Sequence, residues 1–577
     1  MKGEALLWDE VASRWLRFGC PLRVIETADL REVPSALHEV ERSVREERLH
    51  AVGWVAYEAA PAWDAALRVR RPGPWPLLWF GLYRQPEPID LPRAMPLQAL
   101  GPWQPSISQE AYCEAISRIK DYIARGDTYQ VNYTFRLQAP FAGDPFALFV
   151  RLVQAQRPRY PVYLDAGRYV VCSASPELFF RRNGAELVSR PMKGTAPRGR
   201  TWKEDQILAE RLRASEKERA ENVMIVDMVR NDMGRIADIG TVRALRLFEV
   251  ERYPTLLQMT STVRCETTAS LVDIFRAMFP AASITGAPKA RTMEIIAELE
   301  ATPRGIYTGA IGWIAPHFRA QFNVAIRTVI VDREKEIATF GVGGGVVWDS
   351  EAEREYHECL LKARALTEEW PEFDLLESIR WEPGVSYFLL DRHLQRLAES
   401  AAYFDFSFDE MEVRRALDEC AACLPPRPHK VRLQLSREGI RTIQALPLEQ
   451  HPLQRPLRLG RSRDPVDSRN PFLYHKTTHR AVYEAARATR PECDDVLLWN
   501  ERGEATESCV ANLVVRMGGE WITPPVSCGL LPGTLRGALI EQGVLRERRV
   551  TVAELAVAEE IYLINSVRGW MRAVWLG

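Results

Sequence analysis

The chain lacks any long apolar run and any marked excess of charge. No stretch of about 18 consecutive apolar residues occurs in its 577 residues, so the sequence predicts no membrane-spanning helix. Its start, Met1-Lys-Gly-Glu-Ala5, lacks the basic and then apolar pattern of a secretory signal. The 76 basic residues nearly balance the 77 acidic ones, which argues against nucleic-acid and membrane partners. We therefore expect a cytoplasmic protein.

Cysteine is also sparse. The ten cysteines are scattered along a long chain, which fits reduced thiols better than a disulfide framework. One pair, Cys420 and Cys423, has the spacing of a redox or metal site, but no second pair follows it. The pair lies in the amphipathic stretch Met411 to Leu424, so we expect helix packing. No Gly-x-Cys-x-Gly turn of a glutamine-hydrolysing domain is found.

The length predicts several domains. The motifs change after Trp370-Pro-Glu-Phe373, where the sequence predicts a hairpin around Pro383-Gly384. A helix is expected next, begun by Asp391 and burying Leu394, Leu397, Ala401 and Phe404. We expect a short N-terminal subdomain over residues 1–100, a larger domain over 101–368, a linker at 369–373 and a second catalytic domain over 374–577.

The most informative stretch is Arg190-Pro-Met-Lys-Gly-Thr-Ala-Pro-Arg198, which places Lys193 in a turn restricted by two prolines and a glycine. A lysine amine attacks carbon only when it is uncharged, and a site away from water or near other cations lowers its pKa. Most loop lysines are merely solvated surface residues. A catalytic role for Lys193 therefore depends on the motifs around it.

Local patterns place an acid near this lysine. The sequence predicts a helix over about 109–125, ended by Gly126, and strands over 128–134 and 169–173. Glu177 follows the second strand and precedes Lys193 by sixteen residues, across a hairpin that turns near Asn183-Gly184. If the strands pair, both side chains could face one cavity.

Two pairs of glutamates have helical spacing. Glu218 and Glu221 lie on a helix expected from about Ser215, and Glu355 and Glu358 on one expected from Ser350 to about Thr367. The first helix is expected to bury one apolar face, formed by Ala220, Val223, Met224 and Met228. Most helix glutamates are solvated, but two acidic faces brought together would suit Mg²⁺, which prefers oxygen ligands.

Four blocks, in this order, resemble chorismate-using enzymes, and the Lys193 block resembles aminodeoxychorismate synthase component I. The blocks are Ser173–Phe179, Arg190–Arg198, Lys217–Asp232 and Phe279–Lys289. The resemblance implies an α+β fold, a two-layer β sandwich with flanking helices. It also implies that Lys193 and Glu177 are catalytic and that Mg²⁺ is held by Glu221 and Glu358, with Glu218 and Glu355 behind them.

The same resemblance assigns a chorismate pocket. A turn that feeds a helix can offer free N–H groups to an anion, a glycine-rich run lets the backbone approach a carboxylate, and arginine binds carboxylates with two prongs. Val346 stands where a dinucleotide fingerprint needs its third glycine. The implied substrate-binding residues are Thr285, Gly286, Ala287, Tyr307, Arg327, Gly343, Gly344 and Lys362.

One position departs from anthranilate synthase. That relative has a histidine three residues before a serine, tied to elimination of pyruvate, whereas this chain has Gln258 three residues before Ser261. Glutamine does not exchange a proton near neutral pH. Anthranilate synthases also have a residue other than lysine at the position of Lys193. We therefore expect amination of chorismate without cleavage of the product.

The second domain resembles fold-type IV enzymes that use pyridoxal 5'-phosphate, a group that includes aminodeoxychorismate lyase and branched-chain aminotransferases. The matching blocks are His393–Leu397, His475–Arg480, Thr506–Asn512, Gly529–Thr534 and Asn565–Gly569. The resemblance implies an α+β fold in which Lys476 is catalytic and carries the cofactor, while Glu507 keeps the pyridine nitrogen protonated. It also assigns cofactor contacts to Arg396, Asn512, Leu530 and Thr534, with a possible polar contact from Ser566.

Together the resemblances predict a bifunctional enzyme of folate biosynthesis that makes 4-aminobenzoate from chorismate. Ammonia would come from a separate glutamine amidotransferase subunit or from solution, and a homodimer through the lyase domain is possible by analogy. One alternative is an anthranilate or isochorismate synthase fused to a branched-chain or D-amino-acid aminotransferase. Another is a non-catalytic scaffold, which would predict eroded motifs.

Overall fold

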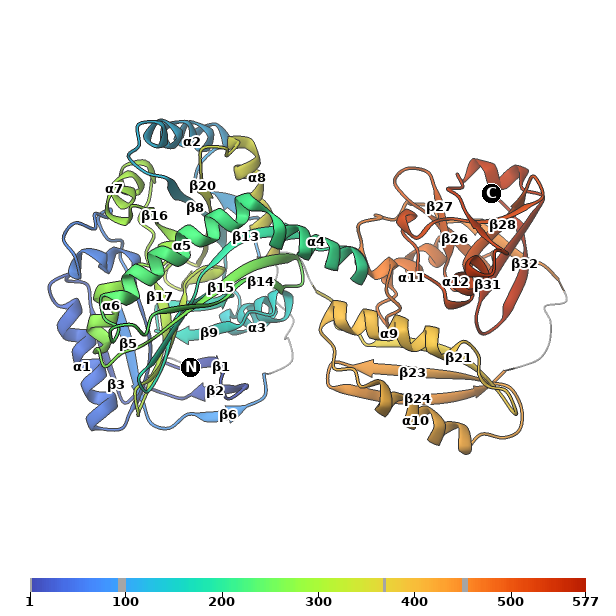
Figure 1. Cartoon of the computed structure of the whole chain (residues 1–577), viewed down its shortest axis with the longest axis horizontal. Helices are drawn as coiled ribbons and strands as arrows, with labels where there is room; N and C mark the ends of the chain where they lie inside the picture. The colour runs from blue at the N-terminus through green and yellow to red at the C-terminus, as the bar shows by residue number, and fades with distance from the viewer. Residues whose placement is uncertain (1–2, 92–99, 367–369, 449–454) are drawn as a thin grey trace. The chain divides into compact units, whose positions relative to one another are not determined.

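The computed structural model describes residues 3–91, 100–366, 370–448 and 455–577. It divides into two compact units (Figure 1). Unit 1 comprises Met1–Pro197 and Ala209–Trp370, and unit 2 comprises Arg198–Leu208 and Pro371–Gly577. Unit 2 thus includes eleven residues, 198–208, that precede the rest of it by a long stretch of sequence. Residue 369 of the expected linker lies outside the described residues.

Unit 1 is built on two large sheets. Within the described residues each has ten strands; one contains β8 (Gln130–Pro140) and β20 (Ile337–Val346), and the other contains β13 (Met192–Pro197) and β15 (Leu256–Glu266). One apolar cluster joins residues of both sheets, such as Val171 and Phe322, because each strand turns alternate side chains to the same core. The expected α+β sandwich with flanking helices is confirmed.

Three helices predicted from the sequence border the candidate site in unit 1. They are α2 (Gln109–Ala124), α5 (Glu216–Gly234) and α8 (Ala352–Ala363). The Ser215 hydroxyl caps α5 by accepting a hydrogen bond from the backbone N–H of Glu218. Helical turns continue after α8 to Leu366, and Thr367 lies outside the described residues.

The predicted buried face of α5 is wrong. Ala220 and Val223 are exposed, Met224 and Met228 are half-buried, and the buried residues are Asn222, Ile225, Val226, Val229, Asp232 and Met233. The helix lies along β13 and β15 with its polar residues near Lys193, as Asn222 shows by bonding to the Lys193 carbonyl. Apolar spacing alone mispredicts the face because the site needs polar side chains on the inner side.

Unit 2 has a four-stranded and an eight-stranded sheet within its described residues. The smaller sheet contains β21 (Leu375–Glu382) and β23 (His429–Ser436), and the predicted hairpin of β21 with β22 (Ser386–Tyr387) is present. The predicted helix after Asp391 is α9 (Leu390–Phe404), which buries Leu394, Leu397, Ala401 and Phe404 as expected. The larger sheet mixes parallel and antiparallel pairs, which confirms the α+β class.

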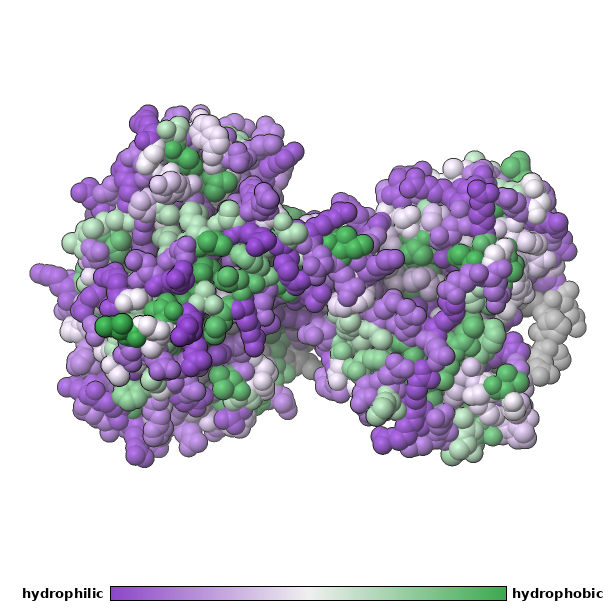
Figure 2. All heavy atoms as spheres, in the orientation of Figure 1, coloured by the Kyte–Doolittle hydropathy of each residue, from purple (hydrophilic) through white to green (hydrophobic). Residues whose placement is uncertain are grey.

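The structure also describes the cysteines and the apolar runs. Among the described residues no two cysteines form a disulfide bond. Cys420 lies half-buried on α10 (Glu410–Ala422), but Cys423 at its end is exposed and does not pack as expected. Across the described residues, no helix has both the length and the apolar character needed to cross a bilayer. On the face drawn in Figure 2, hydrophilic residues predominate and hydrophobic ones form scattered groups.

A buried ion network joins distant parts of unit 1. The Arg304 side chain is 1% exposed and donates to Glu300 Oε1 at 2.7 Å and to the carbonyls of Asn132 and Ile284. The Glu58 carboxylate accepts the backbone N–H of Arg304 at 2.7 Å, and burial raises the pKa of Glu58 to about 7. These groups can stay buried only because their hydrogen bonds are nearly complete.

Replacing Arg304 with methionine should therefore lower the free energy of unfolding of unit 1 by about 3–5 kcal/mol, because Glu300 would remain buried without its main partner. Urea denaturation of the full chain, followed by tryptophan fluorescence, measures this. The control is Arg31→Met, which removes an exposed cation paired with Asp29. A loss no larger than that of the control would contradict the network's role.

Candidate active sites

Lys193 projects from an irregular part of β13. The pairing of β13 with β15 shifts register between Met192 and Thr195, so Lys193 and Gly194 form a bulge. Gly194 has φ +95°, a left-handed conformation that favours glycine, and a Cβ there would lie 3.1 Å from Glu218 Oε2. The bulge turns the lysine toward the glutamates of α5.

The Lys193 side chain is partly buried. Burial lowers its pKa, and Lys362 lowers it further, while the carboxylate of Glu221 opposes both. The backbone around it is fixed, because Asn222 donates to the Lys193 carbonyl at 3.3 Å and Gln258 donates to the Gly194 carbonyl at 2.8 Å. These surroundings favour the uncharged amine that a nucleophile requires.

Glu177 is the predicted acid that acts with Lys193. It follows β10 (Tyr169–Ser175), is 3% exposed, and its backbone carbonyl accepts the N–H of Val324. Burial raises its pKa to about 7, although the charge of Lys193 partly opposes this. The predicted hairpin after it is formed by β11 (Leu178–Asn183) and β12 (Glu186–Arg190). The carboxyl group can therefore hold a proton near neutral pH and deliver it next to Lys193.

The four glutamates surround the same region. Glu358 pairs with Lys362 at 2.9 Å, and Glu355 accepts the Ser350 hydroxyl at 2.7 Å. Burial raises the pKa of Glu218 and Glu355, and a neighbouring glutamate raises each further, Glu221 for the first and Glu358 for the second.

These carboxylates do not form a ready metal site. In the part of the chain that is described, no three His, Cys, Asp or Glu side chains converge closely enough to hold an ion. The donor set nevertheless fits Mg²⁺, because an added cation would relieve the mutual repulsion of these carboxylates. The metal and its ligands stay a prediction.

Two predicted substrate-binding residues have clear polar surroundings. Burial lowers the pKa of the Arg327 guanidinium, which lies 5.7 Å from the ring of Tyr253 and forms no ion pair with any described carboxylate. A buried arginine without an acid suits a ligand carboxylate. Lys362 donates to the Gly343 carbonyl at 3.0 Å, and a Cβ on Gly344 would lie 3.8 Å from its amine.

The other predicted substrate residues lie on the scaffold around them. Gly286 and Ala287 pair with the start of β8, directly before α7 (Lys289–Leu299), so the expected turn feeding a helix is present. The Thr285 hydroxyl bonds back to the Ala281 carbonyl. The ring of Tyr307 lies 4.9 Å from the guanidinium of Arg136.

Sequence reasoning missed three supporting side chains. Gln258 was read only for its lack of a titratable proton, yet it fixes the Lys193 bulge, and Asn222 does so from α5. Gln130 belongs to the predicted strand over 128–134 and lies beside Lys193, since a Cβ on Gly345 would meet both side-chain nitrogens, at 2.1 and 2.6 Å. No local spacing signals these contacts, because each joins distant segments.

Gly345→Ala should abolish the reaction at Lys193 with little loss of stability. The methyl group would meet only the mobile ends of Gln130 and Lys193, so the fold can adjust while the amine is displaced. Activity should fall by about a hundredfold or more, and the Tm should stay near that of the parent. Gly234→Ala, at the end of α5 with open space around its Cβ, is the control. Full activity of Gly345→Ala would show that the amine's position is unimportant.

Unit 2 holds the second buried lysine. Lys476 lines a cavity of about 1780 Å³ together with Arg396, Glu507, Asn512 and Thr534. Burial lowers the pKa of Lys476 to about 8, and Arg396 contributes to the shift. The backbone carbonyl of Lys476 accepts the N–H of Leu376, which ties its segment to β21. Five of the predicted residues thus meet in one cavity.

Arg396 is fixed by an acid that sequence reasoning did not select. Its guanidinium donates to both oxygens of Glu377, at 2.9 and 2.7 Å, and His393 bonds to the same carboxylate at 2.7 Å. Burial alone would raise the pKa of Glu377, but these two neighbours hold it at about 2. His393 also bonds to the Thr534 hydroxyl at 3.2 Å, at the start of α12 (Thr534–Glu541). Arginine, hydroxyl and helix N-terminus together suit a phosphate.

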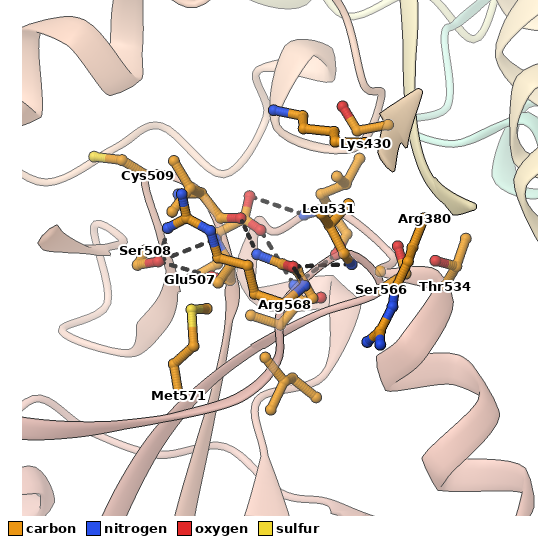
Figure 3. Close-up of a pocket in the computed structure, with 18 of the residues that line it drawn as sticks. Arg380, Lys430, Glu507, Ser508, Cys509, Leu531, Thr534, Ser566, Arg568 and Met571 are labelled. Carbon is orange, nitrogen blue, oxygen red and sulfur yellow. Dashed lines mark hydrogen bonds between the residues drawn. The ribbon is translucent and has the colours of Figure 1, made fainter. Parts of the chain in front are cut away.

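Glu507 lies among hydrogen-bond donors in the same cavity (Figure 3). It accepts the Tyr483 hydroxyl at 2.9 Å, the Leu531 N–H at 3.0 Å and the Asn512 amide at 3.2 Å. Burial raises its pKa to about 7. Leu531 lines the cavity, whereas Leu530, the residue selected from the sequence, is 1% exposed and is not among the lining residues. Ser566 does line it.

The segment that carries Lys476 contacts residues 198–208, the first part of unit 2 in the sequence. His475 lies between the Ser400 hydroxyl, 2.9 Å from Nδ1, and the Arg200 carbonyl, 3.2 Å from Nε2. Burial lowers the pKa of His475 to about 3, so it is neutral. The Tyr403 hydroxyl donates to the Gly199 carbonyl at 2.7 Å, and its ring stacks on His475.

The two sites therefore define an enzyme that has two different partly buried lysines, one near a buried acid and a carboxylate cluster, the other in a cavity with an arginine, a hydroxyl and the start of a helix. The chain belongs to the chorismate binding enzyme family, which matches residues 3–368, and residues 374–574 match the class IV aminotransferases. A class IV aminotransferase domain implies pyridoxal phosphate, and the donor set around Lys476 fits that cofactor.

Relatives with different products resemble unit 1 about equally. Aminodeoxychorismate synthase component 1 of Bacillus subtilis is 40% identical over 276 residues, which are 48% of this chain and 58% of that one. Anthranilate synthase component 1 of Thermus thermophilus is 43% identical over 266 residues, 46% and 57% of the two chains. The chain therefore spans little more than half the length of these relatives. The crystal structure of anthranilate synthase component I from Streptococcus pneumoniae matches with TM-score 0.54 and 25% identity, covering 64% and 92% of the chains.

Proposed function

We propose that this chain makes 4-aminobenzoate from chorismate in two steps. Unit 1 would replace the C4 hydroxyl of chorismate by an amino group, and unit 2 would then remove pyruvate. The observation that carries the proposal is the position of the Lys193 amine near Glu177, an acid whose pKa is raised by burial to about 7, in a chorismate-binding fold. The second unit's class and its buried Lys476 support the second step.

The choice between the two kinds of relative rests on particular residues, because overall identity does not decide it. Lys193 offers a nucleophilic amine, and Gln258 uses its amide to hold the Gly194 carbonyl and to accept the Thr195 hydroxyl. A side chain committed to the backbone and lacking a titratable proton does not promote elimination. These features favour amination at C4 without cleavage in unit 1.

In unit 1 the reaction would proceed by two displacements. The Lys193 nitrogen bonds to ring C2 as both ring double bonds shift and the C4–O bond breaks, and Glu177 gives its proton to the departing hydroxyl, which leaves as water. Ammonia then bonds to C4, the C2–N bond to Lys193 breaks, and Glu177 recovers a proton from the new amine. Mg²⁺ would supply positive charge for the substrate carboxylate near Glu221 and Glu358.

In unit 2 the cofactor, when bound, supplies an electron sink. Arg396 and Thr534 would hold its phosphate, and Glu507 would face its ring nitrogen. Lys476 would bind the cofactor and then, once the substrate amine has replaced it, take the proton from ring C4 as pyruvate leaves. A lysine whose pKa lies near 8 is suited to moving a proton near neutral pH.

Ammonia is proposed to come from a separate glutamine amidotransferase subunit or from solution. The relatives of unit 1 from Bacillus subtilis and Thermus thermophilus are named as component 1, which implies a further component in those organisms. The remaining alternative is an anthranilate or isochorismate synthase joined to a branched-chain or D-amino-acid aminotransferase. It is less favoured because of Lys193 and Gln258 in the first unit.

Product analysis tests the first step. Full-length protein given chorismate, an ammonium salt, Mg²⁺ and pyridoxal phosphate should release 4-aminobenzoate and pyruvate, detected by chromatography. Lys193→Ala should lose amination by about a thousandfold or more, because the nucleophile is removed. It should still cleave supplied aminodeoxychorismate, which serves as an internal control. Anthranilate as the product would refute the proposal.

Cofactor attachment tests the second step without relying on turnover. Protein purified with pyridoxal phosphate should show the absorption band of the lysine-bound cofactor, and borohydride reduction followed by peptide mass spectrometry should place it on Lys476. Lys476→Ala should lose both signals, whereas the exposed Lys335→Ala should keep them. Attachment at another lysine, or none in the parent protein, would overturn the role of Lys476.

A further inference from the structure

One wall of the unit 2 cavity carries cations on neighbouring strands. In the antiparallel pair β21–β23, Arg380 lies opposite Lys430 and Ser378 lies opposite Arg432. Side chains on one face alternate, so these four residues project from the same face of the sheet, and all four line the cavity. Arg568, from the turn between β31 (Glu560–Asn565) and β32 (Gly569–Trp575), lines it too (Figure 3).

This arrangement is unfavourable without a ligand. Like charges directly opposite each other on a sheet destabilise it. Burial lowers the pKa of Lys430, and the charges of Arg432 and Arg568 lower it further, so these cations are close enough to repel one another. The two cationic neighbours and the partial desolvation destabilise the charged form of Lys430, and a bound anion would stabilise it.

The protein itself offers these cations little compensation. Arg380 pairs with Glu382, but the Nε atoms of Arg380 and Arg432 are buried without a hydrogen-bond partner. Among the described residues, the side chains of Lys430 and Arg568 form no ion pair. The carboxylates that line the cavity are Glu484 and Glu507, and Glu507 already accepts three hydrogen bonds.

The phosphate-binding end of the cavity differs in this respect. There Arg396 is forked onto Glu377, and the Thr534 hydroxyl and the start of α12 complete the donors. At that end the charge of Arg396 is balanced by Glu377 and, when the cofactor is bound, by its phosphate. The uncompensated cations on β21, β23 and the β31–β32 turn therefore suit a second anion, separate from the cofactor.

We propose that Lys430, Arg432 and Arg568, assisted by Arg380, form an anion subsite that binds the carboxylates of a dianionic amine substrate. The inference rests on the proposed function, and it names the residues that would make the site prefer such a substrate. An amino acid with an apolar side chain offers only one carboxylate, so it would leave part of this cation cluster desolvated and unpaired and would bind more weakly. The subsite thus favours a lyase acting on aminodeoxychorismate over a branched-chain aminotransferase.

The test uses full-length protein loaded with pyridoxal phosphate. Lys430→Met and Arg568→Met each remove one positive charge and keep a long, unbranched side chain. Each should raise the KM for aminodeoxychorismate by about ten- to a hundredfold, with kcat changed by less than about threefold, because a charge-assisted hydrogen bond to the substrate is lost. Lys430→Arg should restore the KM. Arg469→Met, which removes an exposed cation paired with Asp467, is the control.

A binding experiment separates this inference from the proposed function. Glutarate, a dicarboxylate, should perturb the bound-cofactor absorption band of the parent protein, and butyrate, with one carboxylate, should do so about tenfold more weakly. Both methionine variants should weaken glutarate binding and keep the band itself. If the parent protein does not cleave aminodeoxychorismate but glutarate binding behaves in this way, the subsite stands and the function fails. If cleavage occurs and neither variant changes the KM or glutarate binding, the subsite is wrong.

Discussion

A buried amine is the constraint on which both units depend. An ammonium ion removed from water loses several kcal/mol of solvation, so the protein must either compensate the charge or let the amine become neutral. Unit 1 does both around Lys193, where the carboxylate of Glu221 favours the charged amine while burial and the charge of Lys362 favour the neutral one. Unit 2 surrounds Lys476 with Arg396, which lowers its pKa, and with acids that limit the shift. The neutral form of each lysine is thus favoured by its surroundings in the fold.

The backbone and the neighbouring side chains fix the positions of the reactive groups. A bulge and a left-handed glycine turn Lys193 out of β13, Gly345 leaves space for its amine on the facing sheet, and two side-chain amides hold the backbone on either side of it. In unit 2 the same purpose is served by one acid, Glu377, which fixes both Arg396 and His393. Rigid neighbours, more than the reactive groups themselves, determine how accurately each site is formed.

Local sequence patterns predicted much of the secondary structure and the membership of both sites. Helices α2, α5, α8 and α9 and the two hairpins follow from capping residues, glycine stops and period, all of which act within a few residues. The buried face of α5 could not be predicted in this way, because Asn222 bonds to the Lys193 carbonyl on β13 and Glu221 interacts with the Lys193 amine, and both contacts join segments that are distant in sequence. Leu531 lines the cavity and the predicted Leu530 does not, because a motif identifies a turn but not which of its side chains faces the cavity.

The cationic wall escaped sequence reasoning for the same reason. Arg380 and Lys430 are fifty residues apart, and only the register of β21 with β23 makes them neighbours. Residue types within one strand gave no sign of it, since alternating cations on an exposed strand are an ordinary solvated face. Long-range strand pairing is therefore the step at which a single sequence stops being informative about specificity.

Unit 2 is not one continuous length of chain, and this limits how the protein can be divided. Residues 198–208 contribute the Arg198–Asp205 pair at 2.7 Å, the Gly199 acceptor for Tyr403 and the Arg200 carbonyl, which contacts His475 next to Lys476. A gene cut once near residue 371 would deliver a fragment with those acceptors missing and with Tyr403 and His475 facing water. The two family matches divide the chain once, between residues 368 and 374. The compact unit 2 does not follow this division, because it also includes residues 198–208.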